Sequence, residues 1–165
     1  MRFLQTDVGA EPVLVEAIFP ATPRRVFKAW TDPDEIMKWF GPGPGSLVSA
    51  EIDLRPGGAW CFVVSDTADG RASLMGAYTI IEPAERLQFT WQHVREHASG
   101  GRDETPFSTV TISFEPHGAA TRVKLRHEGI LKEDGRKGVG NGWETTFGQL
   151  EAMLLHNSAA IDPPN

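Results

Sequence analysis

The sequence has few residues that could form covalent cross-links or cross a membrane. Its 165 residues include one cysteine, Cys61, so an intramolecular disulfide is excluded. Cys61 falls in a predicted strand, residues 59–65, where we expect a small packed side chain instead of a reactive thiol, which would need an activating base nearby. No apolar run approaches the ~18 residues of a membrane-spanning helix, and the N-terminus has no charged segment followed by an apolar one. We therefore expect a soluble, cytoplasmic protein without a membrane span.

An excess of positive charge is also missing. Lys and Arg number 16 against 22 Asp and Glu, which gives a formal net charge of -6. A general nucleic-acid-binding protein needs a basic stripe to displace counterions from phosphates, so we expect no nucleic-acid partner. The local basic residues Arg24, Arg25 and Lys28 are predicted to form the solvent-facing side of a helix.

Motifs that hold metals, nucleotides or catalytic nucleophiles are not found. The five histidines show no metal-ligand spacing, and we expect no metal. The glycines at 138, 140 and 142 do not have dinucleotide-binding spacing, and neither a phosphate-binding loop nor a Gly-x-Ser-x-Gly motif is present. We therefore expect no cofactor, and no constellation of residues requires an enzyme.

What the chain does contain is a series of short strand-like stretches followed by one helical stripe. Period-two apolar patterns predict strands over residues 13–19, 47–54, 59–65, 73–82, 86–94, 107–115 and 121–128. Between the first two, Thr22 before Pro23 predicts a helix start, and Thr31 or Asp32 can cap a second short helix. The apolar residues Trp143, Phe147, Leu150 and Leu154 predict a C-terminal helix.

Three glycine-containing segments are predicted to be irregular. Residues 41–45 form either a plain connector or a flexible lip over a cavity. Residues 96–106 are predicted to form a longer polar loop. Residues 138–142 are predicted to be a flexible segment in which glycine lets the C-terminal helix approach the sheet closely.

Alternation along the strands predicts a sheet with one dry, concave face. Val110, Ile112 and Phe114 point to one side while the threonines and serines between them point to the other. Short links between successive strands favour an antiparallel meander, and the C-terminal helix is the one long element able to cover its dry face. We expect a single domain over residues 1–160 with a frayed tail at 161–165.

Large aromatic side chains are spread along this predicted concave face. They either fill the space between sheet and helix or line a pocket for an apolar ligand. His93, His127 and Tyr78 would supply polar anchors, the two histidines either as a shared acid–base pair or as separate hydrogen-bonded groups. The predicted ligand-binding residues are Trp39, Phe40, Trp60, Phe62, Tyr78, Phe89, Trp91, His93, Phe107, His127, Trp143 and Phe147.

A set of short motifs in this order resembles a known family. The motifs are Val26-Phe27-x-x-Trp30-Thr31-Asp32-Pro33, Trp39, Arg55-Pro56-Gly57-Gly58-x-Trp60, Gly76, Glu82-Pro83-x-x-Arg86-Leu87, Thr90-Trp91, Thr121-x-Val123 and Gly142-Trp143. Together, over residues 12–156, they are similar to the Hsp90 ATPase activator homologue family of the START-like (Bet v 1-like, polyketide cyclase-like) superfamily. The resemblance implies an α+β helix-grip fold: a curved seven-stranded antiparallel sheet around a long C-terminal helix, with two short helices after the first strand.

The leading functional hypothesis is non-catalytic binding of a small hydrophobic or amphipathic ligand between the sheet and the C-terminal helix. The resemblance implies two alternatives: a co-chaperone-like protein that contacts a chaperone, or a polyketide cyclase-like enzyme using inward His or Tyr residues. The name-giving relatives engage the chaperone through an extra N-terminal domain, for which this chain has no space. The chain is expected to be a monomer or a homodimer.

Overall fold

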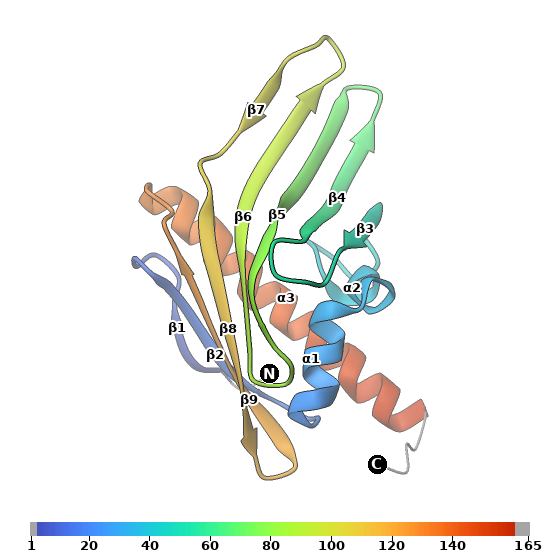
Figure 1. Cartoon of the computed structure of the whole chain (residues 1–165), viewed down its shortest axis with the longest axis vertical. Coiled ribbons are helices and arrows are strands. Elements are labelled where there is room, and N and C mark those ends of the chain that lie inside the picture. Colours follow the sequence, from blue (N-terminus) through green and yellow to red (C-terminus); the bar gives the residue numbers. More distant parts are fainter. Residues whose placement is uncertain (1–2, 161–165) are drawn as a thin grey trace.

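The computed structural model describes residues 3–160, and over that range one antiparallel sheet carries three helices on its concave side (Figure 1). The strands are β1 (Phe3–Asp7), β2 (Val13–Phe19), β3 (Ser49–Ile52), β4 (Ala59–Thr67), β5 (Gly70–Glu82), β6 (Arg86–His97), β7 (Arg102–Glu104), β8 (Ser108–His117) and β9 (Ala120–Glu128). The helices are α1 (Pro23–Thr31), α2 (Pro33–Trp39) and α3 (Glu133–Ala160). The predicted tail at 161–165 lies outside the described residues.

The strand order is β1-β2-β9-β8-β6-β5-β4-β3, with β7 paired to β6. The α+β helix-grip fold, with two short helices after strand 13–19 and a long C-terminal helix, is therefore confirmed. The predicted number of seven strands is wrong, because the described part of the chain forms nine. The additional strands are β1 and β7, whose side chains are mostly exposed and polar and so show no apolar alternation.

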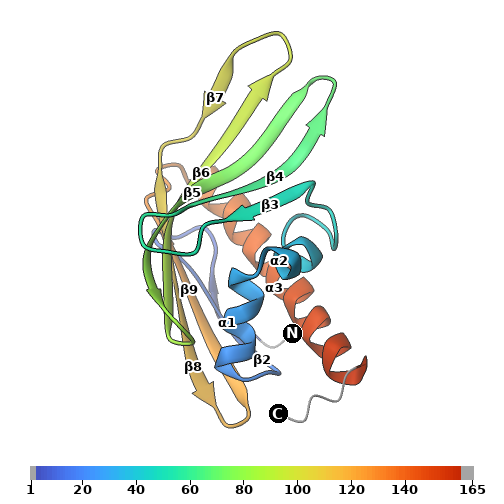
Figure 2. The same cartoon turned by 45° about the vertical axis from the view of Figure 1, so that its right-hand side comes forward.

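The curvature of the sheet separates a closely packed half from an open half. Figure 2 shows β8 and β9 running alongside the helices, while the long hairpins formed by β4–β5 and β6–β7 bend away and extend past them. In β8 and β9 every second side chain is buried, as the alternation predicts. The dry face is thus covered by helices along one part of the sheet only.

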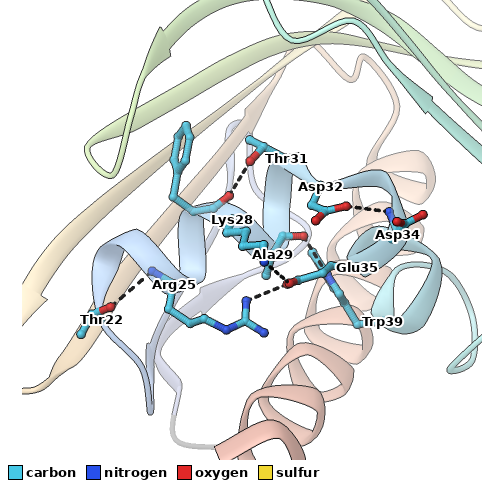
Figure 3. A network of polar contacts seen from close by, with 10 residues as sticks. Thr22, Arg25, Lys28, Ala29, Thr31, Asp32, Asp34, Glu35 and Trp39 are labelled. Atoms are coloured by element: carbon cyan, nitrogen blue, oxygen red, sulfur yellow. Dashed lines mark hydrogen bonds and ion pairs between the residues drawn. The ribbon is translucent and has the colours of Figure 1, made fainter. Parts of the chain in front are cut away.

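Helices α1 and α2 are held together by polar contacts that the sequence pattern did not predict (Figure 3). Arg25 donates to the carboxylate of Glu35 at 2.7 Å, and Lys28 lies 3.5 Å from its other oxygen. Trp39 adds a 3.0 Å hydrogen bond from its indole N–H to the Ala29 carbonyl. The expectation that Arg25 is simply solvent-facing is therefore wrong, because it neutralises the buried carboxylate of Glu35. The predicted cap is confirmed: the Thr22 hydroxyl accepts from the Arg25 backbone N–H.

Helix α3 begins ten residues earlier than the apolar stripe suggests, at Glu133 instead of Trp143. The glycine-rich segment 138–142 is helical, which corrects the prediction of a flexible segment. Arg136 braces this part of the helix by donating hydrogen bonds to the carbonyls of Gly9 and Ile130, both at 3.0 Å. Glycine does permit a close approach here, but to the β1–β2 connection: a Cβ on Gly140 would lie 2.4 Å from Cβ of Val8.

Candidate functional site

A cleft of about 500 Å³ lies at the open half of the sheet. It lies between strands β4–β6 and the first half of α3, and the segment after α2 forms one edge. It is open to solvent on one side, where exposed residues such as His93 and Asn141 form its rim. The lining residues are Phe40, Gly41, Pro42, Val64, Leu74, Trp91, His93, Gly138, Val139, Asn141, Gly142, Trp143, Thr145 and Thr146.

Glycines on α3 make part of the space in this cleft. Gly138 and Gly142 lie one helical turn apart, and a Cβ added to either would meet no atom within 4 Å. Since both residues line the cleft, the missing side chains leave open space beside Trp143 and Val139. The sequence predicts only a backbone role for these glycines, whereas in the structure their lack of side chains also leaves space in the cleft.

The segment that follows α2 forms a lip at the cleft and is fastened to α3. Gln149 donates from Nε2 to the carbonyls of Trp39 at 2.7 Å and Gly41 at 2.9 Å. Gly41 adopts φ +114°, a conformation that favours glycine, and Gly41 and Pro42 both line the cleft. Residues 41–45 were predicted to form either a plain connector or a lip over a cavity, and the second prediction matches the position of Gly41 and Pro42. No pattern in the sequence indicates that Gln149 holds the segment after α2 in place.

Behind the cleft, the space between the sheet and the helices is filled by the protein's own rings. A small void of about 10 Å³ remains there, and its walls are Trp30, Ile36, Phe40, Trp60, Phe62, Tyr78, Phe89 and Trp91. Phe40 and Trp91 line both the void and the cleft, with ring centroids 6.3 Å apart. These two side chains therefore form the partition between a filled interior and an open outer cavity.

His127 is a structural link at the back of the site. The indole N–H of Trp143 donates to His127 Nδ1 at 3.1 Å, and an indole nitrogen can only donate. The imidazole proton is therefore on Nε2, which donates to Ser108 Oγ at 2.7 Å. Burial lowers the pKa of His127 to about 3, so the ring is neutral at neutral pH.

The predicted ligand-binding residues fall into four groups. Phe40, Trp91, His93 and Trp143 line the cleft. Trp60, Phe62, Tyr78 and Phe89 stand around the inner void behind the partition. Trp39, His127 and Phe147 are fully buried in the core, and Phe107 is 60% exposed and lines neither cavity.

The titratable groups near the cleft are spread out. Burial, with a smaller effect of Arg95, lowers the pKa of His93 at the rim. Burial raises the pKa of Tyr78, whose ring lies behind the partition. The structure does not bring His93 and His127 into a hydrogen-bonded pair, because both ring nitrogens of His127 are engaged by Trp143 and Ser108.

The described part of the chain contains neither a candidate metal site nor a helix suited to cross a membrane. No group of three or more His, Cys, Asp or Glu residues within 3–160 is placed to hold a metal ion. In the same range, none of the helices combines the length and the apolar character that crossing a bilayer requires.

Comparison with solved structures shows the same fold in several bacterial proteins. Protein NE0264 from Nitrosomonas europaea has 25% identity and a TM-score of 0.71, and the match covers 94% of this chain and 99% of that protein. Protein CV1439 from Chromobacterium violaceum has 22% identity and a TM-score of 0.70, with 88% and 98% covered. The AHSA1 (SPO3351) protein from Silicibacter pomeroyi has 24% identity and a TM-score of 0.70, with 88% and 99% covered.

The sequence itself was also compared with curated proteins and with protein families. The comparison with curated proteins gave no match. Residues 20–155 match the family described as activator of Hsp90 ATPase homolog 1-like protein. That range runs from the start of α1 to the last turns of α3 and includes every residue lining the cleft. The chain belongs to the activator of Hsp90 ATPase homolog 1-like protein family.

Proposed function

We propose that this protein binds a small hydrophobic or amphipathic ligand in the outer cleft and does not transform it chemically. The observation that carries the proposal is the cleft of about 500 Å³ between β4–β6 and α3. Sites for small molecules are typically ~300–1,000 Å³, with mostly apolar walls and a few polar groups that set orientation. Phe40, Trp91 and Trp143 supply such walls, while His93 and Asn141 supply polar groups at the rim.

The distribution of acids and bases supports binding over catalysis. Among the lining residues, His93 is the one ionisable side chain, and burial together with Arg95 lowers its pKa, which disfavours its protonated form. General acid–base catalysis needs a group within hydrogen-bond reach of the reacting atom. Tyr78 is separated from the cleft by Phe40 and Trp91, and His127 uses both ring nitrogens within the protein. A cyclase-like reaction in the cleft would thus have to use His93 alone.

The proposal is tested by thermal denaturation of the protein in the presence of fatty acids, flavonoids and polycyclic aromatic metabolites. A ligand present at one hundred times its dissociation constant should stabilise the folded state by ~2.7 kcal/mol. We expect at least one of these classes to raise the midpoint in a concentration-dependent manner. If chemically diverse ligands leave the midpoint unchanged, the cleft is not a binding site for such molecules.

A second candidate function, contact with a chaperone, is favoured by the family description together with exposed apolar side chains. Phe107 is 60% exposed just before β8 and Leu131 is 79% exposed shortly after β9, and the adjoining ends of these two strands pair Thr109 with Glu128. Exposed apolar groups near one another are a common feature of protein-binding surfaces.

This second candidate function is tested by the ATPase rate of Hsp90 with and without this protein. Stimulation that is lost in the Phe107→Ser, Leu131→Ser double variant would support this function, and an unchanged rate would count against it.

A further inference from the structure

One buried polar atom near the cleft lacks a partner. The indole Nε1 of Trp30 is the one buried side-chain nitrogen or oxygen in the described part of the chain without a hydrogen bond. Its indole is 3% exposed, so solvent does not reach it. The indole N–H groups of Trp39, Trp60 and Trp143 by contrast all donate to protein acceptors at 3.0–3.1 Å. A buried donor without an acceptor costs ~1–3 kcal/mol, so the Trp30 N–H is a ready site for an acceptor supplied from outside.

The side chain that carries this donor borders the inner void. Trp30 forms part of its wall, and the other wall residues are apolar or aromatic side chains, none of which is charged. Its volume of about 10 Å³ corresponds to roughly one atom-sized group, such as an oxygen. A charged carboxylate would find no cation in this wall, so a neutral acceptor fits better.

The partition between the void and the cleft is thin, and one of its two residues stands next to a glycine. Only Phe40 and Trp91 are shared by the two cavities. Phe40 ends α2 and is followed directly by Gly41, the glycine with φ +114°. Trp91 is half-buried and packs against Phe40 in a tilted arrangement instead of a close stack. A shift of the Phe40 ring would connect the two spaces without disturbing the hydrogen bonds of the sheet.

We propose that the ligand's apolar body lies in the outer cleft while a neutral carbonyl oxygen passes between Phe40 and Trp91 and accepts a hydrogen bond from Trp30 Nε1–H. This inference rests on the proposed function, since it requires a ligand in the cleft. It names the ligand class: aromatic or polycyclic molecules that carry an uncharged ketone or ester carbonyl at one end. The polar part at the other end, where present, faces His93 and Asn141 at the rim.

The test compares two probes of the same shape, 2-acetylnaphthalene and 2-isopropenylnaphthalene, in which the carbonyl oxygen is replaced by a methylene group. Binding is measured by titration against the wild-type protein, and the five indole N–H signals are followed by ¹H–¹⁵N NMR. We expect the ketone to bind about tenfold more tightly, the gain from one added hydrogen bond to a buried donor. We also expect the Trp30 N–H signal to move downfield with the ketone and not with the hydrocarbon.

Control variants separate this inference from the proposed function. Trp30→Phe should remove the preference for the ketone, whereas Trp39→Phe, which removes an indole N–H from a ring that lines neither cavity, should keep it. The NMR measurement on the wild type decides the question if Trp30→Phe does not fold. Equal affinities with an unmoved Trp30 signal would overturn the inference and leave the proposed function intact. Failure of both probes to bind would count against the proposed function and against this inference with it.

Discussion

Trp143 on α3 donates its indole N–H to His127 on β9, and this 3.1 Å hydrogen bond joins the C-terminal helix to the sheet inside the core. His127 is fully buried and is itself held by Ser108. Replacing His127 by Leu fills the buried position with an apolar side chain but removes the acceptor for Trp143. Because the indole N–H would then be buried and unpaired, we expect a loss of ~1–3 kcal/mol in the free energy of unfolding, measured by urea denaturation.

His117→Leu serves as the control for this measurement. His117 lies at the exposed end of β8, and its replacement should change the free energy of unfolding by less than ~0.5 kcal/mol. If both variants unfold at the same urea concentration as the wild type, the Trp143–His127 bond contributes nothing to stability.

The same histidine predicts how stability changes with pH. Burial lowers the pKa of His127 from 6.5 to about 3, so the unfolded chain binds a proton that the folded chain rejects. Its contribution is fully present above pH 6.5 and is lost as the pH falls from 6.5 toward 3, by up to ~1.4 kcal/mol per pH unit. The lowered pKa of His93 acts in the same direction. We expect His127→Gln to show a flatter dependence than the wild type between pH 6.5 and 4, and parallel curves would show that His127 is not responsible.

Gly76 on β5 provides a test of close packing within the sheet. It pairs with Trp60 on β4, and a Cβ at Gly76 would lie 1.9 Å from the Thr90 carbonyl oxygen, the acceptor of the Trp60 indole N–H. Gly76→Ala should therefore force the strands apart and cost ~1–3 kcal/mol or more in the free energy of unfolding. Gly43→Ala is the matched control, since a Cβ there meets no atom within 4 Å. Equal stability of the two variants would contradict the predicted clash.

Most of the fold could be predicted from the sequence because its strands alternate so regularly. In β9, Val123, Leu125 and His127 face the core between exposed or half-buried basic residues, and this pattern alone implies one dry face. The start of α3 could not be predicted, because glycine lowers intrinsic helix propensity and the helix at 133–142 depends on contacts such as Arg136 with Gly9. Strand β7 has three charged, exposed residues, which resemble those of a loop.

The candidate site was harder to predict than the fold. The sequence shows that many aromatic side chains face inward, but not which of them pack against one another. Trp60 and Phe62, for example, stand 4.8 Å apart between ring centroids and close the interior, while Trp143 borders open space. That difference depends on side-chain packing in three dimensions, in particular on where Gly138 and Gly142 leave α3 without side chains.

Gln149 is expected to control the lip of the cleft. Gln149→Met keeps the length of the side chain but removes both hydrogen bonds to the carbonyls of Trp39 and Gly41. We expect a loss of ~1–2 kcal/mol in the free energy of unfolding and faster amide hydrogen exchange in residues 41–46. Gln5→Met on the exposed edge strand β1 is the control and should change neither quantity. Unchanged exchange in residues 41–46 of Gln149→Met would show that the lip is held by other contacts.

The central claim, that the outer cleft holds the ligand, is tested most directly by two matched variants of α3. Gly142→Leu places a side chain into the cleft, while Gly148→Leu places the same side chain on the same helix outside the lining residues. Neither new Cβ meets an atom within 4 Å, and leucine is favoured over glycine in a helix by ~1 kcal/mol, so both variants should fold at least as well as the wild type.

The measurement is titration of each protein with the ligand found by thermal denaturation. The account predicts at least a tenfold loss of affinity, about 1.4 kcal/mol, in Gly142→Leu and wild-type affinity in Gly148→Leu. Equal affinities in both variants would contradict it.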